Sequence, residues 1–136
     1  MKEISLPKVL DIGEAYGQIS WSVRGIYEGY LGWFDGQAVS MYGDSRDELI
    51  GDLLERNGGA DTAHGMAKSL VNDGRPAKAL QMLNIASERW PEKADLHDLR
   101  LQALQALRKK SKNFNESGWL NHGINEVRKD RERQGP

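Results

Sequence analysis

Apolar side chains recur at spacings of three and four residues from about Ser20 onward, which is the period that places them on one face of an α-helix. The pattern predicts an amphipathic helix that is rich in aromatic residues and ends within residues 32–36. The predicted apolar face consists of Ile19, Val23, Ile26, Tyr27, Tyr30 and Phe34.

Small residues follow the same helical period on a separate side of this helix. They are Ser22, Gly25, Gly29, Gly32 and Gly36. Each glycine inside a helix costs about 1 kcal/mol relative to alanine, so several on one stripe favour the close approach of another backbone. The alternative is chance register, because the chain contains 15 glycines and uses others to end helices.

We predict that this glycine-bearing, aromatic helix is a contact surface for a second copy or another domain. The predicted contact residues are Gly25, Tyr27, Gly29, Tyr30, Gly32, Trp33 and Phe34.

The rest of the chain consists of amphipathic helical patterns separated by short glycine, proline or polar breaks. No stretch alternates with period two, so the sequence predicts an all-α bundle of about six helices in a single domain, residues 1–136. We expect an irregular lead-in at 1–15 and a frayed, charged tail at 128–136. The later predicted helices run from Asp44 or Ser45 to Gly58, around Ala63 to Leu70, from Pro76 to Trp90, from about Ala94 to Lys110 and around Trp119 to Val127, with breaks at 37–43 and 113–117.

One helical pair in the middle of the chain resembles a tetratricopeptide unit. Gly74, Ala79, Ala86 and Pro91 have the offsets at which that 34-residue hairpin places its turn glycine, two small packing residues and terminal proline. Ala67 fits the small position where the two helices touch. The following pair matches loosely, and a binding groove normally needs about three repeats. The resemblance therefore predicts architecture rather than peptide binding.

Composition excludes several classes of function. The chain has 136 residues, of which 38% are hydrophobic and 29% charged, with a net charge of -1 and no cysteine. These values argue against nucleic-acid binding, disulfides and thiolate chemistry. No segment approaches the roughly 18 apolar residues of a membrane span. We expect a cytoplasmic protein as the sequence stands, or a periplasmic or secreted one if it is cut from a larger precursor.

The residues that could carry catalysis are scattered. The three histidines are His64, His97 and His122, and their spacing matches no zinc-binding motif. No nucleophile elbow and no phosphate-cradling loop is present. We therefore expect no catalytic residue, no metal site and no cofactor in this chain.

The segment 16–36, which contains Tyr-Leu-Gly-Trp-Phe-Asp-Gly at 30–36, resembles the start of the dimerisation domain of alkyl sulfatases. The resemblance continues through Gly58-Gly59-Ala60-Asp61 and through Asn113-Phe114-Asn115-Glu116. Alkyl sulfatases are zinc hydrolases of the metallo-β-lactamase superfamily. The resemblance implies an all-helical, non-catalytic homodimerisation module that packs beside a metallo-β-lactamase-like catalytic domain, where the zinc would lie.

Two other functions remain open from the sequence. One is a small tetratricopeptide-like adaptor that binds a protein or peptide partner. The other is a small-molecule binder or enzyme in which aromatic residues line a pocket for an alkyl chain, although aromatics at helical spacing more often form a core. The candidates for that pocket are Trp21, Trp33, Phe34 and Tyr42. The loop from Phe34 to Tyr42 would then border the substrate entrance of a parent enzyme.

Overall fold

The computed structural model describes residues 16–32, 34–42 and 46–134. Within these residues all regular secondary structure is helical and there is no strand, which confirms the all-α prediction. The elements are α1 (Ile19–Leu31), the 3₁₀ turn η1 (Ala38–Met41), α2 (Arg46–Arg56), α3 (Gly59–Asn72), α4 (Pro76–Arg89), α5 (Ala94–Lys110) and α6 (Phe114–Gln134).

Helices α3 and α4 form a tight antiparallel hairpin. The four alanines at the contact, Ala63, Ala67, Ala79 and Ala86, are fully buried, and their small side chains let the helix axes approach closely. Gly74 adopts a φ of 73° in the connecting turn, a left-handed conformation that favours glycine. The predicted helical pair is therefore present, while its membership of the tetratricopeptide class stays a prediction.

Helices α5 and α6 extend this packing into a four-helix body. Leu96 and Leu99 of α5 join the alanine-lined core of α3 and α4. Leu104 of α5 packs with Ile124 and Val127 of α6 in a second cluster. The core is thus continuous along one side of the chain, from α3 to α6.

The last helix is longer at both ends than the sequence predicted. It begins at Phe114, inside the predicted polar break, because the Asn113 side chain caps it by accepting a hydrogen bond from the Glu116 N–H at 3.0 Å. The helix continues to Gln134. The prediction of a frayed tail was therefore wrong for residues 128–134. Arg131 forms an ion pair with Asp98 of α5 at 2.5 Å, which holds the charged end against the body.

Helix α2 is attached to this body by one buried apolar side chain and one cation. Leu54 is buried in the main core. Arg89 of α4 donates to Asp52 at 2.8 Å and also to Glu55. A Cβ at Gly51 would lie 3.0 Å from the Arg89 guanidinium, so a glycine lets that side chain cross the helix surface. The predicted cap at Asp44 or Ser45 lies outside the described residues.

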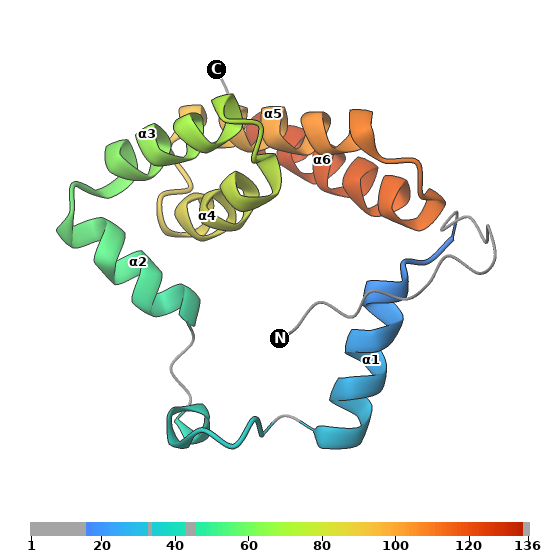
Figure 1. Cartoon of the computed structure of the whole chain (residues 1–136). Helices are drawn as coiled ribbons and strands as arrows, with labels where there is room; N and C mark the ends of the chain where they lie inside the picture. The colour runs from blue at the N-terminus through green and yellow to red at the C-terminus, as the bar shows by residue number, and fades with distance from the viewer. Residues whose placement is uncertain (1–15, 33, 43–45, 135–136) are drawn as a thin grey trace.

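Helix α1 stands apart from the body. Figure 1 shows α3–α6 packed together, with α1 and α2 extending from opposite ends of that body in the same direction and η1 near their far ends. Among the described elements, α1 packs against no other helix. None of its residues is buried. The structure therefore leaves the helix that the sequence singled out as a contact element open to its surroundings.

Candidate association surface

The predicted aromatic face of α1 is exposed to solvent. Tyr27 is 62% exposed and Tyr30 is 88% exposed. Ile26, between the small and aromatic sides, is exposed as well. Monomeric soluble proteins rarely present contiguous apolar patches of several large side chains. An amphipathic helix that leaves large apolar side chains exposed and packs against no other described helix is typical of a surface that binds a partner.

The glycines that share one helical stripe do not all lie inside α1, which ends at Leu31. Gly25 and Gly29 lie inside the helix, and a Cβ built on either would meet no atom within 4 Å. Gly32 and Gly36 adopt φ values of 67° and 85°, so they serve as turn residues. The prediction that the helix continues toward Gly36 was wrong, because the left-handed conformation at Gly32 stops it at Leu31.

The aromatic and glycine sides of α1 are distinct faces. At 100° per residue, the pair Gly25 and Gly29 lies roughly 150° around the axis from the pair Tyr27 and Tyr30. No described atom lies within 4 Å of a Cβ built on Gly25 or Gly29. The helix therefore offers two separate faces to a partner, a bulky one and one that permits close backbone approach.

The segment after α1 is organised by Asp35. Its Oδ1 accepts hydrogen bonds from the Ser40 hydroxyl at 2.7 Å and from the Gln37 N–H at 3.0 Å. The Ser40 bond, and after it the Gln37 bond, lower the pKa of Asp35 below its usual value of 3.8. This turn displays Phe34 and Tyr42, which are 44% and 73% exposed. The predicted contact residue Trp33 lies outside the described residues.

The N-terminal end of α1 is tied to the start of α6. The ring of Tyr16 packs on that of Phe114, with centroids 5.6 Å apart and an interplanar angle of 47°. The Asn115 side-chain amide donates to the Tyr16 carbonyl. These contacts place α1 at one end of the four-helix body (Figure 1).

Helix α2 adds apolar surface that the sequence prediction of the contact did not include. Leu49, Ile50 and Leu53 are exposed, although Leu54 beside them is buried. Their helical spacing is visible in the sequence, but spacing alone does not show whether such a face forms core or surface. The packing of α2 in the structure shows that Leu54 is the buried one of these four residues and that Leu49, Ile50 and Leu53 are exposed.

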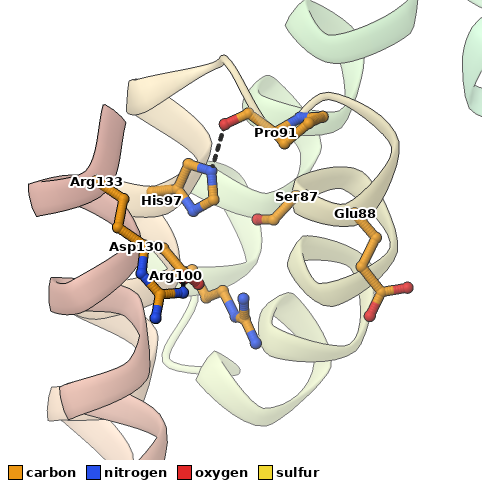
Figure 2. Close-up of a pocket in the computed structure, with 7 residues that line it drawn as sticks. All are labelled: Ser87, Glu88, Pro91, His97, Arg100, Asp130 and Arg133. Atoms are coloured by element: carbon orange, nitrogen blue, oxygen red, sulfur yellow. Dashed lines mark hydrogen bonds and ion pairs between the residues drawn. The ribbon is translucent and has the colours of Figure 1, made fainter. Parts of the chain in front are cut away.

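The structure does not gather the candidate chemical groups into a metal site. Within residues 16–32, 34–42 and 46–134, no three histidine or carboxylate side chains are placed to hold one ion. His97 is buried and its Nε2 bonds to the Pro91 carbonyl at 2.8 Å (Figure 2). His122 meets Trp119 edge to face at 5.8 Å. No helix in the described part is long and apolar enough to cross a membrane.

None of the three cavities formed by described residues is lined by Trp21, Phe34 or Tyr42, and Trp33 lies outside the described residues. Cavities formed at Ser87, at Asp47 and at Phe114 are lined by other side chains. Trp21 is on the exposed surface of α1, whereas Phe34 and Tyr42 flank the Asp35 turn. The hypothesis of an aromatic substrate entrance stays a prediction.

These features define an all-helical protein whose apolar helix α1 packs against no other described helix. Residues 1–130 match the alkyl sulfatase dimerisation family, and the chain belongs to that family. It is similar to the linear primary-alkylsulfatase of Pseudomonas sp. (strain ATCC 19151), with 29% identity over 106 residues. That similarity covers 78% of this chain and 20% of the relative, so the chain spans about a fifth of that protein's length. No solved structure matches it.

Proposed function

We propose that this chain is a homodimerisation module and that α1, with the turn after it, forms the contact between two copies. The observation that carries the proposal is the exposure of Tyr27 and Tyr30 on a helix that packs against no other described helix. Burying such side chains is worth about 1.5–3 kcal/mol each. Membership of a family named for dimerisation supports the same conclusion.

The glycine face supports a close contact. Gly25 and Gly29 have open space where a Cβ would stand, so nothing inside one copy requires glycine at these positions. Each glycine nevertheless costs about 1 kcal/mol of helix stability relative to alanine. A partner backbone seated on this side would account for both residues.

We further propose that the module is non-catalytic and serves a hydrolase of the alkyl sulfatase type. The relative that it resembles is a linear primary-alkylsulfatase, of which the similar region covers only a fifth. In this proposal a metallo-β-lactamase-like catalytic domain supplies the zinc and the reacting groups, and this chain joins two such subunits. The chain itself would then need no cofactor.

Sedimentation velocity at micromolar concentration tests the assembly. We expect the wild-type chain to sediment as a dimer and Gly29→Leu to shift the distribution toward monomer. A Cβ at Gly29 meets no described atom within 4 Å and leucine raises helix propensity, and circular dichroism of the variant establishes that it folds. Gly65→Leu is the matched control, because Gly65 is also helical and has open space around its Cβ position.

The outcomes separate the alternatives. A wild-type chain that is monomeric at these concentrations would count against homodimerisation and would favour the adaptor hypothesis if a peptide partner were captured. A dimer that persists in Gly29→Leu but dissociates in Tyr30→Ser would move the contact from the glycine face to the aromatic face. Hydrolysis of an alkyl sulfate by the purified chain would contradict the non-catalytic role.

A further inference from the structure

The exposed apolar side chains of the protein are concentrated in one stretch of the chain. Of the 18 large apolar side chains that are exposed among the described residues, 14 lie between Ile19 and Leu53. This stretch, residues 19–53, contains α1, η1 and α2, and we call it the arm. Exposed apolar side chains gathered on one segment are typical of an interaction site, and here they extend well beyond α1.

Helix α2 has one side on the body and an apolar stripe on another side. Gly51 and Leu54 are buried against the body. Leu49, Ile50 and Leu53 form the stripe, and all three are exposed. At 100° per residue, the centre of this stripe lies roughly 120° around the axis from Gly51 and Leu54. A partner on the stripe would therefore leave the contact between α2 and the body in place.

A contact confined to α1 is small for a stable dimer. Helix α1 has 13 residues, whereas each side of a standard protein–protein interface uses about 20–30 residues and buries about 800 Å². Only some residues of a helix can face one partner, because its side chains point outward all around the axis. The dimer therefore needs apolar surface besides α1, and the α2 stripe lies in the same arm.

The charges around the α2 stripe disfavour its contact with the same stripe of a second copy. Arg46 lies one turn before the stripe and in line with it, and Arg56 lies one turn after it, at its edge. Two such stripes packed together in either direction would bring arginine close to arginine, and like charges disfavour an interface. The apolar side of α1 carries no charged residue, since Arg24 and Glu28 lie elsewhere around the helix. Its tyrosine rings can also receive a guanidinium through a cation–π contact.

The positions of the two helices on the body permit a reciprocal contact. Figure 1 shows α1 and α2 leaving opposite ends of the α3–α6 body in the same direction. In a two-fold dimer each contact occurs twice, with the roles of the two copies exchanged. We infer that the apolar side of α1 in each copy docks on the Leu49, Ile50 and Leu53 stripe of α2 in the other copy. This pairing rests on the proposed homodimer, and it leaves the glycine side of α1 for the close backbone contact described above.

Disulfide cross-linking between two chains of different size tests the pairing. The protein has no cysteine, so single cysteines can be introduced without a competing thiol. A chain carrying Val23→Cys, on the apolar side of α1, is co-expressed with a tagged, longer chain carrying Leu53→Cys, and the purified dimer is oxidised. We expect a disulfide-linked species that contains one chain of each kind. The control replaces Leu53→Cys with Glu48→Cys, on a different side of α2, and should give little of that species.

The variant Leu53→Ser measures what the stripe contributes to assembly. In a reciprocal dimer this substitution removes two buried leucines, so we expect sedimentation to show a dissociation constant raised about tenfold or more. Met66→Ser is the matched control, because Met66 is an exposed large apolar residue of α3 outside the arm, and it should leave the constant unchanged. Circular dichroism establishes that each variant folds, and Leu49→Ser provides a second test if Leu53→Ser does not.

The results distinguish the pairing from the dimer itself. A disulfide that forms only between two copies of the Val23→Cys chain would overturn the pairing of α1 with α2 and leave the dimer standing. An unchanged dissociation constant in Leu53→Ser, or equal cross-linking by Glu48→Cys, would have the same consequence. A wild-type chain that sediments as a monomer would instead overturn the dimer, and the pairing with it.

Discussion

Tyr16 packs its ring on Phe114 with the centroids 5.6 Å apart, although 98 positions separate the two residues in the sequence. The contact ties the segment that leads into α1 to the first residue of α6. It is the point at which the exposed helix meets the four-helix body. The position of α1 relative to the body therefore depends on how firmly this contact is held.

Removing the Phe114 ring should loosen that contact. We expect Phe114→Ala to broaden the distribution of distances between α1 and α6, because the aromatic contact is lost while the core stays intact. The chain has no cysteine, so spin labels at Ser22→Cys and Asn125→Cys can report the distance in labelled chains diluted with unlabelled ones. Trp119→Ala, which removes another exposed aromatic ring of α6, is the control. An unchanged distribution in Phe114→Ala would show that other contacts hold α1.

The stability of the body should depend on the centre of its core. Leu83 is fully buried between the helices, so Leu83→Ala should lower the free energy of unfolding by about 2–5 kcal/mol. Met66→Ala, at a side chain that is 49% exposed, should change it by less than about 0.5 kcal/mol. Urea denaturation followed by circular dichroism measures both. An equally large loss for Met66→Ala would show that the effect does not depend on burial in the core.

Docking of α2 should be sensitive to Arg89. This guanidinium bridges Asp52 and Glu55, and the Glu55 hydrogen bond is the main reason that the pKa of Arg89 is raised. Arg89→Met should speed amide hydrogen exchange in residues 46–56 and leave that of α5 unchanged. Added salt should also speed amide hydrogen exchange in residues 46–56 of the wild-type chain, but by less than the substitution does. Arg56→Met, at the end of α2, is the control, and equal acceleration in both variants would exclude a specific role for Arg89.

Acid should open the turn after α1. The folded-state pKa of Asp35 lies below its usual value of 3.8 because Ser40 and Gln37 donate to the carboxylate. A lowered pKa means that the ionised side chain stabilises the turn fully above that usual value, and that this contribution is lost as pH falls through the lowered pKa. The Gln37 amide shift in an NMR titration should therefore have its midpoint below 3.8. Asp35→Asn should abolish that transition, and a midpoint above 3.8 would contradict the bonding of the turn.

Helical periodicity, together with glycine and proline punctuation, determined most of the secondary structure. The sequence predicted the all-α class and the alanine-lined pairing of α3 with α4, because helix faces and small packing positions are local properties of the pattern. It placed the end of α1 too late, since a glycine in a helical register can equally stop the helix. It also missed the continuation of α6 to Gln134, where Arg131 forms an ion pair with Asp98 of another helix that the local pattern does not reveal.

The sequence by itself identified the α1 helix and the residues that give it two distinct faces. Only the tertiary structure decided that no other described helix covers those faces, because whether an apolar face forms core or surface depends on what packs against it. The exposure of Leu49, Ile50 and Leu53 was likewise decided by tertiary structure. These residues and Leu54 share one helical pattern, and only the packing of α2 on the body selects Leu54 as the buried one.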